Sequence, residues 1–413
     1  MSIQHWAIKI TNDANKSKLV RKLLGGTVDE FSFLNGLQGM LFSPLALERF
    51  IDEEDRHDNK IITQETSQSL RTMSSGEQKK ALLNYLFDQH TDFIILDNPF
   101  DNLDVESQEQ LVNTLADRSH QTTFIQIISR KEDLLPFISN FASLNADRLC
   151  IHDAQNNLFE TKENSSFTRP IPDALQPIEF KHERLIELRD VTVSFENRTI
   201  LRNINWTIKK GEFWELSGKN GSGKTTILSM LTGENPKGYG QDLFLFGKKK
   251  GSGESIWDIK KKIGYFTPAM TMKFTGYHTV ENMLISGLND SIGLYIRPTE
   301  SQLRLAKEWL KLIHLWDKKD RLFHELSMGE KRLIMTTRAM IKHPLLLILD
   351  EPTAGLDDTS ARLLVELVNK IAHESDTTTI FVSHRKEPGL KADFIYQLQM
   401  NENGSTGHVI SRS

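Results

Sequence analysis

Gly218-Lys-Asn-Gly221-Ser-Gly223-Lys224-Thr225 is the stretch that decides the fold, because it has the pattern Gly-x-x-x-x-Gly-Lys-Thr. The apolar residues 213–216 precede it, and a helical pattern at 227–231 follows. The context is therefore a strand, a loop and a helix. Glycines let the backbone curl so that its N–H groups and the start of the helix point at a phosphate group. The stretch predicts a phosphate-binding loop in an α/β domain.

Lys224 in such a P-loop reaches the β- and γ-phosphates of a nucleotide, and the hydroxyl of Thr225 ligates Mg²⁺. An ordinary glycine-rich turn is the alternative interpretation. We expect all the residues of the loop and the first residues of the helix to contact nucleotide. These residues are Gly218, Lys219, Asn220, Gly221, Ser222, Gly223, Lys224, Thr225 and Thr226.

Three polar residues follow expected strands farther along the chain. Asp350 ends an apolar run, where a carboxylate can hold Mg²⁺, and Glu351 is placed to polarise the attacking water as general base. His384 follows the next strand at a spacing suited to the γ-phosphate. We predict that Glu351, His384 and Lys224 are catalytic and that Thr225 and Asp350 hold the metal. Capping carboxylates and a structural histidine are the alternatives.

The chain contains the same plan twice. Met73-Ser-Ser-Gly-Glu and Leu326-Ser-Met-Gly-Glu each precede an apolar run that ends in Asp-Xaa-Pro. In both copies the first serine precedes the aspartate, Asp97 or Asp350, by 23 residues. Because the order and the spacing agree, we predict an α/β fold with two P-loop NTPase domains in tandem, each with a helical subdomain.

The order of P-loop, Leu-Ser-x-Gly-Glu signature, Asp-Glu-Pro and terminal histidine resembles the ATP-binding cassette (ABC) family. The resemblance implies ABC-type domains and an ATPase that uses ATP and Mg²⁺. It also implies that the signature of one domain completes the nucleotide site of the other, in a head-to-tail sandwich. The family stacks an early-strand aromatic on adenine, and Phe195 matches that position; a core aromatic is the alternative.

The first half has lost most of the P-loop chemistry. Ile10, Asp13 and Asn15 stand where the second half has glycines, and only Lys16 and Ser17 persist. Side chains at these positions would crowd the loop, and Asp13 would place negative charge where phosphate belongs. We therefore predict a degenerate site in this half.

The hydrolytic groups of the first half differ as well. Asn98 stands where the second half has its glutamate, and an amide cannot accept the proton of water. Arg130 replaces the histidine. Lys16 precedes Asp97 by 81 residues, against 126 for the second-half pair, so the first helical subdomain is the smaller one. A divergent working site, or nucleotide binding without turnover, is the alternative.

The intact P-loop has no signature nearby in sequence to supply donors to the far side of the γ-phosphate. For a sandwich within one chain, the resemblance implies that the first-half signature completes the intact site, and that Ser327 and Gly329 face the degenerate one. Pairing of second halves from two chains is the alternative. The first-half signature residues are Ser74, Ser75, Gly76 and Glu77.

Composition narrows the class of protein. A length of 413 residues favours two domains, and a net charge of −4 gives no bulk reason to bind nucleic acid. The single cysteine, Cys150, excludes a disulfide framework and fits a reducing cytoplasm. No apolar run approaches the ~20 residues of a membrane-spanning helix. We expect a cytoplasmic protein, either free or held at the cytoplasmic face of the membrane by an integral membrane permease.

Pro170, Pro172 and Pro177 lie in a stretch with little periodicity, which is typical of an extended linker; a surface loop within one domain is the alternative. We therefore predict a degenerate ABC domain at 1–165, a linker at 166–181 and an intact ABC domain at 182–413.

The second half also resembles the ModF-type tandem ATPases, which are associated with molybdate uptake and are also labelled photorepair proteins. The stretches 236–247, 251–264 and 285–295 carry the resemblance, which covers most of residues 185–390. Most transporter cassettes have a glutamine that links nucleotide to the membrane partner, and here Pro268 replaces it. Pro44 repeats this departure in the first half. Coupling to a permease therefore does not follow from the resemblance alone.

Three functions are therefore open. The chain is the ATPase of an importer, a soluble ATPase that acts on ribosomes or nucleic acid, or a regulatory ATP-binding protein. The short, proline-bearing linker counts against the second, and the lysines of 248–250 and 260–262 are typical of a solvated surface. Co-purification with a permease, with ribosomes or RNA, or with neither distinguishes the three.

Overall fold

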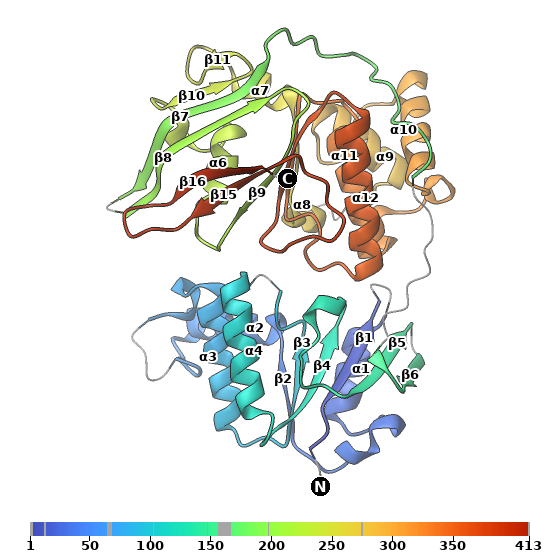
Figure 1. Cartoon of the computed structure of the whole chain (residues 1–413). Coiled ribbons are helices and arrows are strands. Elements are labelled where there is room, and N and C mark those ends of the chain that lie inside the picture. The colour runs from blue at the N-terminus through green and yellow to red at the C-terminus, as the bar shows by residue number, and fades with distance from the viewer. Residues whose placement is uncertain are drawn as a thin grey trace. The chain divides into compact units, whose positions relative to one another are not determined.

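A computed structural model describes residues 3–11, 14–63, 68–101, 103–146, 148–155, 167–196, 198–273 and 276–411. The chain divides into two compact units. The first comprises Met1–Glu163 and Gly355–Thr359, and the second comprises Asn164–Ala354 and Ser360–Ser413. Figure 1 labels their helices and strands.

The first unit contains a six-stranded sheet with the order β2-β3-β4-β1-β5-β6. All neighbouring pairs are parallel except β5 and β6. The strands are β1 (Trp6–Ile10), β2 (Gly39–Phe42), β3 (Phe93–Asp97), β4 (Thr123–Ile128), β5 (Asn140–Asn145) and β6 (Arg148–His152).

Helices cover both faces of this sheet. Ile94 and Leu96 pack in a cluster with residues of α3 and α4, whereas Phe93 and Ile95 pack in a cluster with residues of α1. A strand that is buried on both faces has a continuous apolar run, as β3 does. The helices are α1 (Lys16–Leu24), η1 (Asp29–Leu34), α2 (Pro44–His57), η2 (Leu70–Thr72), α3 (Ser75–Asp88), α4 (Val105–Arg118) and η3 (Lys131–Asp133).

The second unit repeats the sheet. Its order β12-β13-β14-β9-β15-β16 matches that of the first sheet strand for strand, with an antiparallel pair again at the β15–β16 edge. The repeat and the predicted tandem α/β fold are confirmed. The strands are β9 (Phe213–Gly218), β12 (Ile263–Phe266), β13 (Leu346–Asp350), β14 (Thr378–Val382), β15 (Phe394–Gln399) and β16 (Thr406–Ser411).

A second, antiparallel sheet occurs in this unit, with the order β11-β10-β7-β8. The long strand β7 alternates buried and exposed residues over most of its length, as expected of a sheet with one solvated face. In Figure 1 it lies on the side of the unit opposite α9 and α10. The strands are β7 (Arg184–Phe195), β8 (Arg198–Lys209), β10 (Asp242–Leu245) and β11 (Lys248–Lys249).

The helical subdomain of the second unit lies between β12 and β13 in the chain and is larger than its first-half counterpart of α2, η2 and α3. Pro268 is the first residue of α8, and Pro44 is the first of α2. Proline suits this position because the first helical N–H has no partner within the helix. The helices of the unit are α6 (Lys224–Leu231), η4 (Pro236–Gly238), α7 (Ile256–Lys262), α8 (Pro268–Lys273), α9 (Val280–Ile285), η5 (Ser286–Asn289), α10 (Glu300–Leu312), η6 (Trp316–Lys318), η7 (Phe323–Glu325), α11 (Met328–Met340) and α12 (Asp358–Glu374).

The predicted linker, in its described part from residue 167, contains no helix or strand and packs on the helical subdomain of the second unit. Phe167 is buried, and its ring stacks on that of His314 with the centroids 5.8 Å apart. Pro170 and Pro172 line a hollow together with Arg304 of α10. The segment is therefore anchored to this unit. No helix among the described residues is long and apolar enough to cross a membrane.

Candidate nucleotide site

The P-loop joins the end of β9 at Gly218 to the start of α6 at Lys224. Gly223 caps this helix with a φ of 96°, in the left-handed region that favours glycine. A Cβ atom on Gly223 would lie 2.5 Å from Leu201 Cδ2, and one on Gly218 would lie 2.7 Å from Ser222 Oγ. The conformation of the loop therefore requires glycine at both positions.

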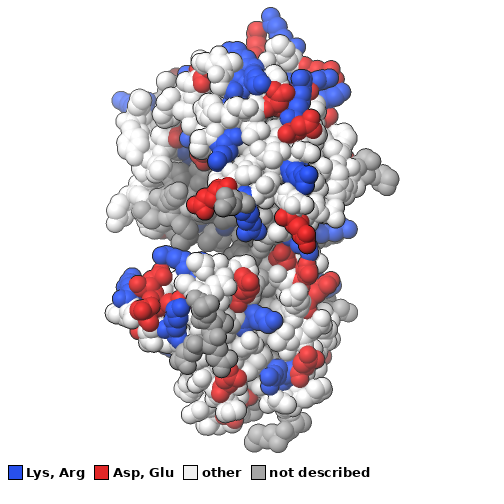
Figure 2. Space-filling model, turned by 90° about the vertical axis from the view of Figure 1, so that its left-hand side faces the viewer, with Lys and Arg blue, Asp and Glu red and all other residues white. Residues whose placement is uncertain are grey.

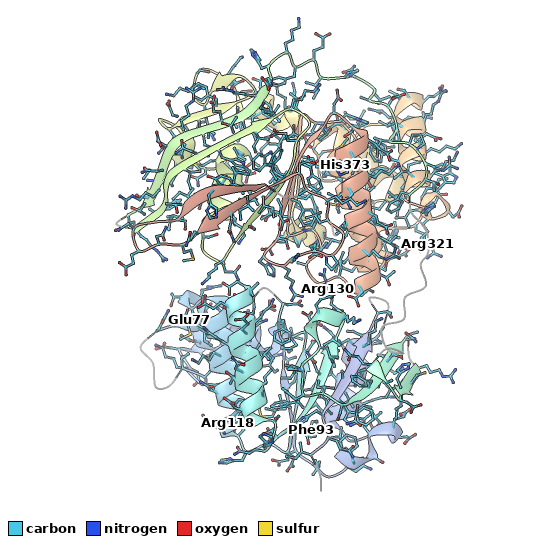
Figure 3. All side chains as sticks on the ribbon, in the orientation of Figure 1. Glu77, Phe93, Arg118, Arg130, Arg321 and His373 are labelled. Carbon is cyan, nitrogen blue, oxygen red and sulfur yellow. The ribbon has the colours of Figure 1, made fainter. Side chains whose placement is uncertain are left out.

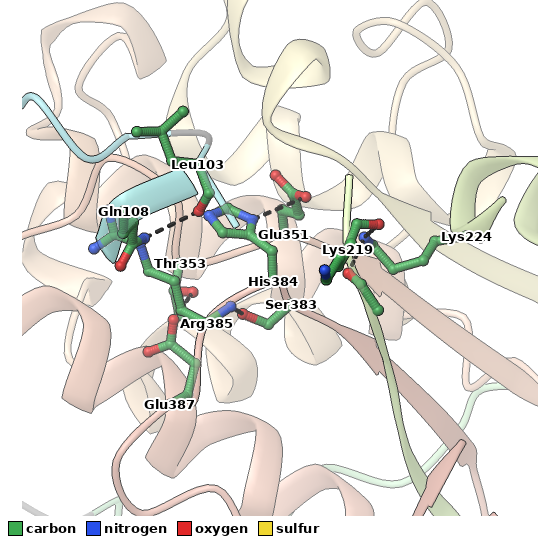
Figure 4. Close-up of polar contacts among 11 residues, drawn as sticks. Leu103, Gln108, Lys219, Lys224, Glu351, Thr353, Ser383, His384, Arg385 and Glu387 are labelled. Carbon is green, nitrogen blue, oxygen red and sulfur yellow. Dashed lines mark hydrogen bonds and ion pairs between the residues drawn. The ribbon is translucent and has the colours of Figure 1, made fainter. Parts of the chain in front are cut away.

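The side chain of Lys224 lies against its own loop. Its Nζ donates to the carbonyl oxygens of Gly218 at 2.7 Å and Lys219 at 3.1 Å, as Figure 4 shows. The hydroxyl of Ser222 is buried and has no hydrogen-bond partner among the described residues. An ammonium group, an unpaired hydroxyl and the N–H groups at a helix start form a set of donors that fits a phosphate group.

The other predicted loop residues are accessible to a ligand. Lys219 and Thr225 are exposed, and Asn220 and Thr226 are half-buried. An added Cβ on Gly221 would meet no atom within 4 Å, so this part of the loop borders open space. The structure thus leaves the hydroxyl of Thr225 available at the first turn of α6.

Asp350 and Glu351 follow one another at the end of β13, and their pKa values move in opposite directions. Burial, and then the adjacent Glu351, raises the pKa of Asp350 to about 6. The hydroxyl of Tyr265 donates to Asp350 Oδ2 at 3.5 Å. The hydrogen bond with His384 lowers the pKa of Glu351, so Glu351 ionises at a lower pH than Asp350 does. Such divergence is typical of acid–base sites.

His384 lies two residues beyond β14, with its Nδ1 3.1 Å from Glu351 Oε1 (Figure 4). Its Nε2 is buried and has no hydrogen-bond partner among the residues that the structure describes. One ring nitrogen therefore orients on the glutamate while the other is available to a bound group. The sequence predicts a phosphate contact for His384 but not this pairing.

The backbone at Glu351 adopts a left-handed conformation, with a φ of 49°. Its N–H donates to the Val382 carbonyl at 2.9 Å, and its own carbonyl accepts from the N–H of Ala354 at 3.1 Å. A non-glycine residue persists in this conformation only where its surroundings hold it. These two hydrogen bonds fix the turn that carries the carboxylate.

Phe195 is the last residue of β7, and its side chain is 42% exposed. Lys237 Nζ lies 5.8 Å from the centre of the ring. A partly exposed aromatic ring can stack on a planar base, whereas a core aromatic would be buried. The exposure favours the adenine-stacking interpretation of Phe195.

In the first half, Lys16 begins α1 and lies 3.0 Å from the carboxylate of Asp97, the last residue of β3. In the second half, the corresponding lysine donates to the carbonyl oxygens of its own loop instead. Ser17 is exposed, as Thr225 is, and Asp13 lies outside the described residues. The two charged groups that persist in the degenerate site thus bind each other.

Asn98 and Arg130 occupy backbone positions that correspond to those of Glu351 and His384. Asn98 has a φ of 43°, and its N–H donates to the Ile127 carbonyl, as Glu351 does to Val382. Arg130 is buried two residues beyond β4, at the position that corresponds to His384. The backbone positions of Asn98 and Arg130 therefore correspond to those of Glu351 and His384, as the sequence predicts.

Both signatures begin a helix in the same way. Ser74 caps α3 and forms a capping box with Glu77, and Ser327 forms the same box with Glu330 at the start of α11. Glu77 is labelled at this end of α3 in Figure 3. A capped helix start presents backbone N–H groups that can donate hydrogen bonds to an anionic group.

The glycines of the signatures are packed differently. A Cβ on Gly76 would lie 3.1 Å from Ser107 Oγ, whereas one on Gly329 would lie 2.3 Å from Ser360 Oγ. Gly329 is therefore required by the packing of its own unit. Substitutions at the two glycines are for this reason not equivalent probes of function.

The donor set fits a magnesium–nucleotide complex. No group of three or more His, Cys, Asp or Glu side chains among the described residues could hold a metal ion alone. Thr225 and Asp350 would supply a hydroxyl and a carboxylate, and Mg²⁺ commonly completes such a partial set with substrate phosphates. The raised pKa of Asp350 is what an adjacent cation would lower.

Comparisons with known proteins identify the family of the chain. Residues 201–354 match the family model described as ABC transporter. The chain belongs to the ABC transporter ATP-binding proteins and is an ATPase. It is 34% identical to the ABC transporter ATP-binding protein ModF of Escherichia coli K12, over 92% of this chain and 88% of that one. An uncharacterized ABC transporter ATP-binding protein of Schizosaccharomyces pombe is 30% identical, over 77% of this chain and 66% of its own length.

Solved structures share the tandem fold. A chain in a model of ribosome-bound archaeal Pelota and ABCE1 matches with a TM-score of 0.65 and 14% identity, over 99% of this chain and 75% of that one. The complex of an archaeal ribosomal stalk protein with the recycling factor aABCE1 gives a TM-score of 0.61 and 15% identity, over 98% and 85%. At these identities the likeness concerns the fold alone.

Several contacts at the site are not predicted from the sequence. Tyr265 hydrogen-bonds Asp350, the charge of Arg385 helps to lower the pKa of Glu351, and Thr353, in the turn that follows Glu351, donates to Glu387 at 2.6 Å. The sequence signal that could have indicated Tyr265 is its position near the end of an expected strand, three residues before Pro268.

Proposed function

We propose that ATP is hydrolysed at the second-half site, with Glu351 as general base. The observation that carries this proposal is the hydrogen bond of His384 to Glu351, which keeps the carboxylate ionised beside Asp350 and the P-loop lysine. An ionised carboxylate can accept a proton from the attacking water, and the transfer yields a carboxylic acid and hydroxide character on the nucleophile.

The other residues have separate tasks in this proposal. Lys224, Ser222 and the loop N–H groups bind the phosphates, and Phe195 stacks on the base. The Nε2 of His384 contacts the terminal phosphate, where charge develops. Thr225 and Asp350 hold Mg²⁺, which when bound offsets the charge of the phosphates.

The test of this function is Glu351→Gln. The amide has nearly the same shape as the carboxylate but cannot take a proton. ATP binding should persist, while steady-state phosphate release should be lost. Turnover at the wild-type rate would refute the assignment of the base.

We further propose that the first-half signature, Ser74–Glu77, completes this site. The chemical argument is that a P-loop contacts phosphate from one side, so the far side needs further donors. The first half keeps a fully formed capping box although its own P-loop has lost its glycines. Retention of one part and loss of the other is expected if the retained part serves the intact site.

We propose that the ATPase works with a protein partner, an integral membrane permease, in transport. The likeness to ModF supports this proposal, and so does a set of apolar side chains that are 54–86% exposed. Large exposed apolar side chains that are near in sequence are typical of protein contacts. They lie between α9 and α10 or just before α9 and are Tyr277, Ile292, Tyr295 and Ile296. Molybdate is the substrate to test first, because the ModF-type resemblance implies it.

A role on ribosomes is the alternative, favoured by the tandem fold shared with the ribosome-bound chain. On the face drawn in Figure 2, acidic and basic side chains are interspersed rather than gathered by sign, which does not favour RNA binding there. Affinity purification from membranes solubilised in detergent, with Tyr295→Ser as control, separates the two. A permease that is captured by the wild type and lost in the variant supports transport, and captured ribosomes support the alternative.

A further inference from the structure

Arg332 of α11 is a buried arginine next to the catalytic turn. It is 5% exposed. Its Nη1 donates to Thr271 Oγ1 at 3.0 Å, and its Nη2 donates to the carbonyl of Ala354 at 3.3 Å. Its guanidinium also lies 5.5 Å from the centre of the Phe266 ring. One side chain therefore joins α11, α8, the end of β12 and the turn that follows Glu351.

The partners of this arginine are all neutral. No carboxylate within the described residues forms an ion pair with Arg332, and its Nε has no hydrogen-bond partner there. Burial lowers the pKa of Arg332 to about 10, so the group is still charged at neutral pH. A buried charge without a counter-ion is destabilising, and buried arginines are usually paired. We therefore expect Arg332 to have a function that offsets the cost of burying its charge.

The contact with Ala354 leads directly to Glu351. Ala354 receives the Arg332 bond on its carbonyl, and its N–H donates to the carbonyl of Glu351 at 3.1 Å. Glu351 is held on the other side by Val382 and has a left-handed φ of 49°. A strained backbone conformation relaxes when the groups that hold it are removed. Arg332 is thus two hydrogen bonds away from the proposed base along the backbone.

We propose that Arg332 is a positioning residue for ATP hydrolysis, which holds the 351–354 turn so that the Glu351 carboxylate is aimed correctly. Thr271 of α8 supports the guanidinium from the other side and so links the position of α8 to that of the base. This inference rests on the role proposed for Glu351. It concerns a residue that does not itself touch the reacting groups.

Arg338 is a matched control on the same helix. It is 4% exposed, and burial lowers its pKa to about 10 as well. Its Nε donates to Ser286 Oγ at 3.0 Å and its Nη2 to the Ser291 carbonyl at 2.7 Å. These partners belong to η5 and the residues after it, so Arg338 has similar burial and charge, and these two hydrogen bonds lie away from the 351–354 turn.

The experiment compares Arg332→Lys and Arg338→Lys in the full chain. Lysine keeps the charge but cannot span both acceptors as the planar guanidinium does. Arg332→Lys should lower kcat by roughly 10- to 100-fold, since misplacement of a reacting group by about 1 Å costs that much, and should leave the ATP Kd within about twofold. Arg338→Lys should lower the denaturation midpoint and leave kcat within about twofold.

A second readout separates positioning from a general structural effect. In the Glu351→Gln background, Arg332→Lys should not lower the residual single-turnover rate further, because there is no base left to aim. An equal loss in both backgrounds, or a wild-type kcat in Arg332→Lys, would overturn the proposal. Full activity of Glu351→Gln alone would instead overturn the assignment of the base, so the two failures are distinguishable.

Thr271→Val decides the matter if Arg332→Lys does not fold. This change keeps nearly the same side-chain shape and every charge, and it removes the hydroxyl that accepts from Nη1. It should lower kcat by roughly three- to tenfold without a change in ATP Kd. An unchanged kcat in folded Thr271→Val would then refute the positioning role.

Discussion

Lys16 Nζ lies 3.0 Å from Asp97 in the first half, so the lysine and the aspartate that the two P-loop halves have in common neutralise each other there. The carboxylate of Asp97 is buried, whereas the lysine is partly exposed. The lysine of the first-half site is therefore held by the aspartate of the same site. This gives a physical reason to expect different consequences from the same substitution in the two halves.

Lys16→Ala should leave the ATPase rate nearly unchanged but lower the stability of the first half by about 1–3 kcal/mol, because a buried carboxylate loses its partner. Lys224→Ala should abolish hydrolysis. Phosphate release and urea denaturation of both variants check the pair. Asn98→Ala should also keep the rate, and a tenfold loss in folded Asn98→Ala would show that the first half does chemistry.

Asp350→Asn should stabilise the nucleotide-free protein by about 1–3 kcal/mol near pH 8, because the ionised carboxylate is held there against a raised pKa. The stability that Asp350 contributes is complete below its ordinary pKa of 3.8 and is lost as pH rises through about 6. The gain in the variant should therefore shrink as the pH falls from about 8 to about 5. Chemical denaturation at both pH values measures it, and a gain independent of pH would contradict the assignment.

His384→Ala should move the acid limb of the kcat profile to higher pH. The hydrogen bond from His384 is the main cause of the lowered pKa of Glu351, so its removal lets the carboxylate take up a proton sooner. The base is active in its ionised form, and activity is therefore lost at a higher pH as the pH falls. The profile of kcat between about pH 5 and pH 8 tests this, with His373→Ala on α12 as the control histidine. Coincident acid limbs in wild type and His384→Ala would contradict it.

Ser75→Glu should reduce ATP hydrolysis at least about tenfold, whereas Met328→Glu should leave most of it, because only the first-half signature is proposed to serve the intact site. Both residues are half-buried and begin their helices, α3 and α11, where an acidic side chain is compatible with the helix. Gly329→Asp is a poorer probe, since a side chain there meets Ser360. The rates are measured on monomers isolated by size exclusion. The opposite ranking would indicate that second halves from two chains pair.

Much of the fold follows from spacing in the sequence. The shared interval before Asp97 and Asp350 predicts equivalent strands, and both residues do end equivalent strands of sheets with the same order. The antiparallel sheet was missed, although residues 184–195 alternate well enough to indicate a long amphipathic strand. The P-loop could be predicted from its residue types, because its need for glycine depends on the conformation of a few neighbouring residues.

Contacts between residues distant in the sequence were not predictable. Lys16 and Asp97 are 81 residues apart, and Arg332 lies 61 residues from Thr271. Their pairing depends on how helices pack against strand ends, which no local pattern encodes. The hydrogen bond of His384 to Glu351 has the same origin, because it requires the ends of β13 and β14 to lie side by side.

Glu351 and Asn98 occupy equivalent turns with φ values of 49° and 43°. Asparagine adopts the left-handed region more readily than glutamate does, because its short amide can hydrogen-bond locally. The first half thus has the residue that suits its backbone, and the second half has the one that suits the proposed reaction. The proposed base is then a residue at which stability has been given up for activity, so Glu351→Asn should yield a more stable protein that cannot turn over.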